Sequence, residues 1–125
     1  MNHVSDPPLN TEDALTFPPM VEQWPEADLR IEGLSGRILK GEHGWVIFMA
    51  ADRDVVVPQH RHGAQWGVVL DGMMTLTVGD STRSYRCGES HYIPEGVDHE
   101  ATLYAGWRGL YVFERGGPPV IRPER

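Results

Sequence analysis

Turn-forming residues divide most of this sequence into short apolar runs. The 125 residues include 14 Gly and 10 Pro, and from residue 29 onward turn signals recur roughly every eight to twelve residues with no helical period between them. Runs of this length favour strands, which we expect at 29–31, 37–39, 45–51, 55–57, 66–70, 73–78, 81–87, 90–93, 99–104 and 107–114. The chain is therefore predicted to be all-β, with antiparallel strands in a sandwich or barrel.

Two dipeptides predict how neighbouring strands connect. Asp71-Gly72 separates 66–70 from 73–78, and a two-residue Asp-Gly loop favours the type I′ turn of a β-hairpin. Gly79-Asp80 repeats the signal before 81–87. We therefore expect two successive hairpins in this part of the chain.

Both ends of the chain lack the strand pattern. Residues 1–28 contain five prolines, which exclude a long helix or a central strand. We expect an extended N-terminal arm at 1–28, a barrel at 29–115 and a C-terminal tail at 116–125. The arm has four large apolar side chains with which it could pack on a surface: Phe17, Met20, Val21 and Trp24.

Charge and composition exclude several classes of protein. The 18 acidic residues outnumber the 11 basic ones, for a net charge of −7, and no run of Lys or Arg could neutralise a row of phosphates. No apolar stretch approaches the ~20 residues that span a bilayer. The single cysteine, Cys87, can form no internal disulfide and is expected to be buried and inert. With no secretory signal visible at residues 1–8, we expect a cytoplasmic protein without nucleic-acid or membrane partners.

Three histidines have a spacing that suits a metal ion. His60 and His62 flank one residue, and on a strand such side chains share a face with Cα atoms about 6.6 Å apart, which two imidazoles can close around one ion. Gly88, Pro94 and Gly96 predict a sharp turn that returns the third, His99, to the sheet.

These residues resemble the two motifs of the cupin family. The second motif, Gly-x5-Pro-x-Gly-x2-His, is matched from Gly88 to His99, although Leu103 replaces its final Asn. The first is matched at His60, His62 and Gly72, with Asp54 in place of its opening Gly. The resemblance covers about residues 40–115, and it implies a double-stranded β-helix, or jelly-roll barrel, with a metal ion inside near one end.

The cupin motif implies that Gln65 stands where the family usually carries a glutamate ligand. In one unbroken strand Trp66, not Gln65, would share a face with the two histidines, so a bend at Gly63-Ala64 is expected. The implied metal ligands are His60, His62, Gln65 and His99. In the alternative, Gln65 only forms hydrogen bonds in the barrel mouth and leaves a three-histidine site.

A site of neutral ligands leaves the charge of a divalent ion uncompensated. It should attract an anionic group and favour Lewis-acid chemistry. Ligand type cannot name the ion, so we expect one divalent transition metal, which is Zn, Fe, Ni or Mn. Four residues could line the cavity, although core packing is the default for most of them: Met49, His91, Tyr92 and Tyr111. Four arginines are candidates to hold a substrate carboxylate: Arg53, Arg83, Arg86 and Arg108.

The expected function is that of a metal-dependent cupin acting on a small, carboxylate or sugar-acid-like molecule by isomerase, ring-opening or lyase chemistry. Some cupins with a glutamine at this position act on uronates. The alternatives are an iron-dependent dioxygenase and a non-catalytic small-ligand-binding cupin. No catalytic residue is identified beyond the metal ligands. We also expect a homodimer in which the arm and the outward-facing Trp66 contact the partner, the alternative being that the arm folds back on its own barrel.

Overall fold

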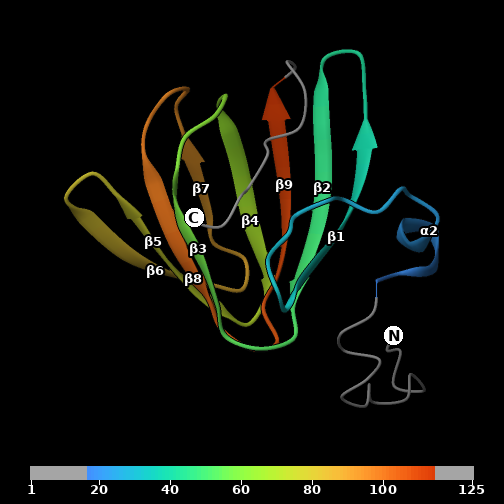
Figure 1. Ribbon diagram of the computed structural model, residues 1–125, viewed down its shortest axis with the longest axis horizontal. Coiled ribbons are helices and arrows are strands. Elements are labelled where there is room, and N and C mark those ends of the chain that lie inside the picture. The colour runs from blue at the N-terminus through green and yellow to red at the C-terminus, as the bar shows by residue number, and fades with distance from the viewer. Residues whose placement is uncertain (1–16, 115–125) are drawn as a thin grey trace, which may run out of the picture.

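Two antiparallel sheets face each other in the computed structural model, which describes residues 17–114 (Figure 1). The first sheet has five strands in the order β1 (Leu34–Lys40), β2 (Gly44–Ala51), β9 (Arg108–Glu114), β4 (Gln65–Asp71) and β7 (Ser90–Ile93). The second has four in the order β3 (Val55–His60), β8 (His99–Leu103), β5 (Met73–Val78) and β6 (Ser81–Arg86). This is the jelly-roll architecture predicted from the sequence.

Most connections cross from one sheet to the other. The exceptions are the β1–β2 hairpin and the β5–β6 hairpin, in which Val78 lies opposite Ser81. The predicted hairpin at Gly79-Asp80 is therefore confirmed. The one predicted at Asp71-Gly72 is wrong, because β9 and β7 occupy both edges of β4 and leave β5 no place beside it. Gly72, which has a φ of 74°, lies instead in the turn that takes the chain from β4 to β5 in the opposite sheet.

The predicted strand at 29–31 is also wrong. Leu29 is buried and packs against the core as its apolar character suggests. Arg30, however, has a φ of 58°, in the left-handed region that interrupts an extended strand. This segment therefore covers the core without joining a sheet.

The space between the sheets is filled by alternate residues of each strand. On β2 the buried side chains Trp45, Ile47 and Met49 point inward, as the two-residue period of a strand requires. Trp107, just before β9, is fully buried. The apolar core thus occupies most of the interior and leaves little free volume.

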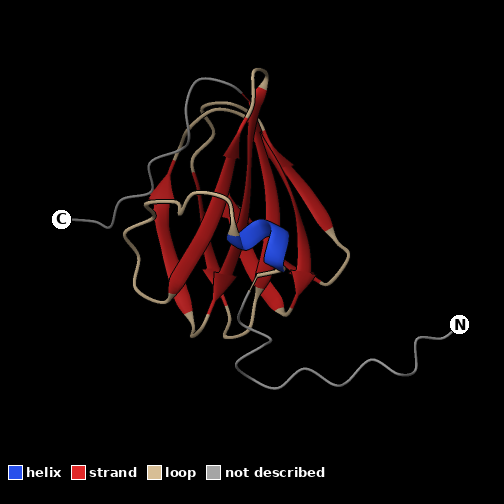
Figure 2. Cartoon of the chain, turned by 90° about the vertical axis from the view of Figure 1, so that its right-hand side faces the viewer, coloured by secondary structure: helices blue, strands red, loops and turns tan. Residues whose placement is uncertain are grey.

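The N-terminal arm folds back on its own barrel over residues 17–28. A short helix, α2 (Pro19–Glu22), lies on the outer face of the five-stranded sheet (Figure 2). Phe17 and Val21 are buried there against Ala50, and the ring of Phe17 meets that of Phe48 edge to face with 5.3 Å between centroids. Met20 stays exposed. Of the four large apolar side chains of the arm, all but Met20 therefore pack against the barrel of their own chain.

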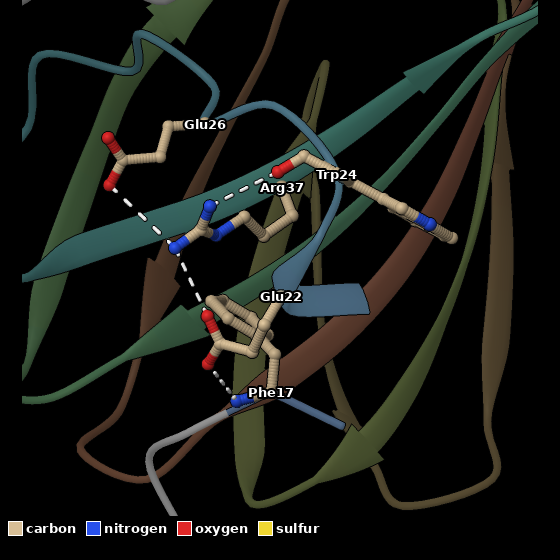
Figure 3. Close-up of polar contacts among 5 residues, drawn as sticks. All are labelled: Phe17, Glu22, Trp24, Glu26 and Arg37. Carbon is tan, nitrogen blue, oxygen red and sulfur yellow. Dashed lines mark hydrogen bonds and ion pairs between the residues drawn. The ribbon is translucent and has the colours of Figure 1, made fainter. Parts of the chain in front are cut away.

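One arginine anchors the arm to β1. The guanidinium of Arg37 donates hydrogen bonds to the carboxylate of Glu22 and to the main-chain carbonyl of Trp24, both at 3.1 Å (Figure 3). The other oxygen of Glu22 accepts a bond from the main-chain N–H of Phe17 at 3.2 Å. Carboxylate and guanidinium together hold the helix against the sheet. Within residues 17–114, no helix has the length and apolar character needed to cross a membrane.

Candidate metal centre

Three histidine side chains converge at one end of the barrel. His60 ends β3 and lies directly opposite His99, the first residue of β8, while His62 follows in the crossover to β4. Each offers one nitrogen, and the three nitrogens lie within 4.8 Å of one another. The ring centroids are 4.2 to 5.0 Å apart. The predicted convergence is therefore observed, and metal binding by these residues is a proposal that it supports.

An irregularity in β3 turns His60 inward. Val55 and Val57 are both buried, so a regular strand would point residue 60 away from the core. The pairing of β3 with β8 shifts register between Val57 and His60, and this bulge reverses the parity. The sequence reasoning missed this shift, since it placed a change of face only at Gly63-Ala64.

The turn between β7 and β8 forms a hydrogen bond with the main chain of His62. Gly96 has a φ of 76°, which favours glycine, and its N–H donates to the carbonyl of His62 at 3.0 Å. The glycine of the Pro-x-Gly motif therefore connects the two segments that carry His62 and His99. This contact explains why the motif and the histidine pair belong to one site.

Main-chain carbonyls define which nitrogen of each ring is free. The Nδ1 atoms of His60, His62 and His99 lie 2.7, 2.8 and 3.0 Å from the carbonyl oxygens of Pro58, Gly63 and Val97. A carbonyl only accepts hydrogen bonds, so each Nδ1 carries the proton. Each neutral ring then has its lone pair on Nε2, the form that binds a metal ion.

Burial keeps the three imidazoles neutral at physiological pH. Loss of hydration lowers the pKa of His60 and His62 below the usual 6.5, and lowers that of His99 to about 4. The hydrogen bonds to the carbonyls oppose the shift but do not cancel it. A metal ion would therefore meet little competition from protons near pH 7.

Gln65 points into the barrel, as the sequence predicted. It is buried at the start of β4, whereas the neighbouring Trp66 is 42% exposed on the outer face. Its side-chain oxygen Oε1 has no hydrogen-bond partner among the described residues, and it lines the same cavity as the three histidines. A buried acceptor without a donor is costly, and a cation would satisfy it. The donor set thus fits a divalent transition metal.

The cavity behind the histidines is small and largely apolar. It has a volume of about 40 Å³, and Met49, His91 and Tyr111 are in its wall. Tyr92 was expected there too, but this expectation is wrong: Tyr92 is 62% exposed, because its neighbour His91 takes the inward position in the strand alternation. Most of the remaining wall consists of apolar side chains that sequence reasoning did not assign to the site: Leu34, Val57, Met74, Leu76, Ala101, Leu103 and Phe113.

No charged side chain of the described residues lines this cavity. None of the four candidate arginines reaches it. Arg53 pairs with Asp52 and Glu32, and Arg83 lies over the ring of Tyr85. Cys87 also differs from expectation, because it is exposed and its Sγ lies 3.2 Å from the carbonyl oxygen of Leu70. A substrate in the cavity would therefore meet neutral groups and the metal site.

Comparisons with known proteins agree with the two-sheet fold. Residues 45–103 match a family model described as "Cupin domain". No curated protein matches the sequence.

Solved structures share the fold at low sequence identity. An RmlC-like cupin from Shewanella frigidimarina superposes with a TM-score of 0.63 at 22% identity, covering 71% of this chain and 86% of that one. KdgF from a Halomonas species gives 0.63 at 19% identity, over 73% and 88%. Oxalate decarboxylase from Bacillus subtilis, a protein with Mn(II) centres, gives 0.68 at 18% identity, over 79% of this chain and 29% of that one. This chain thus spans less than a third of the decarboxylase.

Replacing Gln65 tests its place in the site. We expect Gln65→Ala to weaken metal retention by roughly 10- to 100-fold or more, because the replacement removes a buried oxygen beside the three histidines. Metal content after dialysis against a chelator measures the effect. Gln59→Ala is the control, since Gln59 is exposed and bonds to Asp98. Equal metal retention in Gln65→Ala and wild-type protein would contradict a ligand role.

Acid should destabilise the metal-free protein through its buried histidines. Burial lowers the pKa of His91 and His99 to about 4, whereas the unfolded chain titrates near 6.5. Between these values the unfolded chain binds more protons, so the free energy of unfolding falls as pH drops from 6.5 toward 4. Urea denaturation at pH 7 and pH 4.5 measures this. The His91→Leu variant should lose about 1–3 kcal/mol less stability than wild type over that range, and an identical loss would be the opposing result.

Proposed function

Because residues 45–103 match a cupin family model and the fold is that of RmlC-like cupins, we propose that this chain is a cupin metalloenzyme that acts on a small molecule at His60, His62, His99 and Gln65. The observation that carries the proposal is the arrangement of the three imidazoles. Their Nδ1 atoms lie within hydrogen-bond distance of main-chain carbonyls. One nitrogen of each ring lies within 4.8 Å of the others, and all three rings line an apolar cavity. Gln65 supplies the fourth donor.

A divalent ion held there would polarise a carbonyl or carboxylate oxygen, which is Lewis-acid chemistry. The protein would contribute a neutral set of donors, so that the charge of the ion stays available to the substrate. The apolar wall would limit the access of water and strengthen electrostatic interactions within it. Isomerase, ring-opening and lyase reactions all use this kind of polarisation. Zn, Fe, Ni and Mn all suit the donor set.

The size of the cavity limits the range of possible substrates. Pockets for drug-sized ligands span about 300–1,000 Å³, whereas this one has about 40 Å³. The substrate would place only a few atoms inside, and a sugar ring would stay at the mouth. Since no charged side chain of the described residues lines the cavity, the metal would compensate at most one negative group. The best candidates are short carbonyl compounds and monocarboxylates.

An iron-dependent dioxygenase is the second candidate. It is favoured by the apolar wall, which suits dioxygen and apolar substrates better than it suits a strongly hydrated anion. The three-histidine set is also compatible with iron.

Metal analysis followed by substrate screening tests the proposal. Protein purified without chelators should contain about one transition-metal ion per chain, and His99→Ala protein should contain almost none. Wild-type protein loaded with Zn, Mn or Ni should convert a short oxo- or hydroxy-carboxylate, followed by NMR, whereas His99→Ala should not. Oxygen consumption only by the iron-loaded protein would favour the dioxygenase. Wild-type protein that takes up no metal would overturn both.

We also propose that the protein forms a homodimer through the outer face of its five-stranded sheet. Residues directly opposite one another on adjacent strands form an apolar row across all five: Leu39, Val46, Val112, Trp66 and Tyr92. Four of the five are 41–62% exposed. Solvent-facing sides of antiparallel sheets are normally polar, so this face has the character of a covered one.

The opposite sheet provides an internal contrast. The corresponding row across its four strands is Val56, Thr102, Thr75 and Ser84, which is mainly polar. The apolar row exposes roughly 500 Å² per copy, and its half-buried neighbours Val68 and Leu110 extend it toward the area of a stable interface. The row contains no acidic group. Two copies with a net charge of −7 could therefore meet there without bringing like charges together in the contact. A two-fold contact would place the row against itself.

Light scattering on the full-length protein tests this interface. We expect a dimer for wild type and a monomer for Trp66→Glu, because a carboxylate in the centre of an apolar contact is costly to desolvate. Val56→Glu is the matched control, since Val56 is a 64% exposed apolar residue on the opposite sheet, and it should stay dimeric. A monomeric wild type, or a Trp66→Glu dimer, would contradict the proposal.

A further inference from the structure

His91 is a buried histidine without a hydrogen-bond partner. It lies on β7 with 8% of its surface exposed, and neither ring nitrogen has a partner among the described residues. Its ring contacts are the aromatic rings of Tyr85 and Tyr111, with centroids 5.0 and 5.4 Å away. An unpartnered buried polar group costs stability, typically about 1–3 kcal/mol. An apolar side chain would fill this position at lower cost.

The position of His91 relates it to the metal site without making it a ligand. It lines the same cavity as the three histidines, but it is not among the residues whose nitrogens lie within 4.8 Å of one another. On the neighbouring strand Gln65 lies opposite Ile93, and Gly67 lies opposite His91. His91 is therefore two residues, or about 6.6 Å along the strand, from the level of Gln65. A short molecule could therefore reach from the level of Gln65 to His91.

Gly67 makes room for the ring of Tyr111 beside His91. It lies opposite His91 on one side and Tyr111 on the other, and the ring of Tyr111 covers it. A Cβ atom at Gly67 would overlap the ring of Tyr111. Glycine thus permits the two aromatic rings to approach each other across the central strand. The result is a polar imidazole in a wall that is mostly apolar.

We infer that His91 is a ligand-binding residue, which forms a hydrogen bond with the second polar group of a small molecule whose first oxygen faces the histidine cluster. This inference rests on the proposed metal function. Burial lowers the pKa of His91 to about 4, so the ring is neutral near pH 7 and offers one donor and one acceptor. No charged side chain of residues 17–114 lines the cavity. The chemistry selects a short hydroxy- or oxo-monocarboxylate and disfavours a dianion.

Two acids that differ in one hydroxyl group can test this role. Lactate and propionate have the same carbon skeleton, but propionate lacks the hydroxyl that His91 would bind. Titrating each into Co(II)-loaded full-length protein, with visible absorption as the readout, gives two affinities. In His91→Phe the affinity for lactate should fall about tenfold, which is typical for the loss of one buried hydrogen bond, while that for propionate stays within about twofold. His43→Phe is the control, because the side chain of His43 is 88% exposed to solvent.

A second measurement does not depend on ligand or metal. The melting temperature of metal-free His91→Phe should rise by several degrees, because the replacement removes two unsatisfied buried nitrogens. If the Phe variant fails to fold, His91→Gln, which retains a donor and an acceptor, should keep the wild-type preference for lactate, and its loss there would contradict the inference.

The outcomes separate this inference from the proposed function. An unchanged ratio of lactate to propionate affinity in cobalt-loaded His91→Phe would overturn the role of His91 and leave the metal site intact. Wild-type protein that holds cobalt but binds neither acid would overturn it too. Failure of the wild-type protein to bind cobalt would instead overturn the proposed metal function.

Discussion

The candidate site depends on the hydrogen bonds between three imidazole Nδ1 atoms and main-chain carbonyls. These bonds orient the rings of His60, His62 and His99 and leave Nε2 free on each. Many metal sites use carboxylates for this purpose, which add negative charge around the ion. Here the orienting groups belong to the backbone, so they add none. The geometry of the site is thereby tied to the turns that carry the carbonyls, and its charge is set by the ion alone.

The same dependence explains why the surrounding strands take the form they do. The carbonyl of Pro58 lies in the bulge of β3, and that of Val97 lies in the turn before β8. Gly96 then bonds to His62 and closes the ring of contacts. A regular β3 would point His60 outward, and a turn without Gly96 would lose the link to His62. Irregular backbone at these points is therefore a requirement of the site.

Local signals predicted much of this molecule. Glycine and proline turns located nine strands, and the motif spacing identified the three histidines that converge. Pairing between distant strands could not be read from such signals: Asp71-Gly72 has the chemistry of a hairpin turn, but the edges of β4 are occupied by β7 and β9, which lie far away in sequence. The bulge before His60 and the inward position of His91 likewise depend on the partner strands, so the sequence showed the residue types without their orientation.

The neutrality of the donor set limits which ligands the metal site can bind. Three neutral imidazoles, a carboxamide and an apolar wall would leave a divalent ion with an excess of positive charge in a medium of low polarity, where attraction for a first anionic group is strong. A second anionic group would find no cation among the described residues that line the cavity, and its desolvation would be uncompensated. A neutral hydrogen-bonding partner for the rest of the ligand avoids that cost. His91, buried and with both ring nitrogens unpartnered in the described chain, is a side chain of the wall that can supply it as donor and as acceptor.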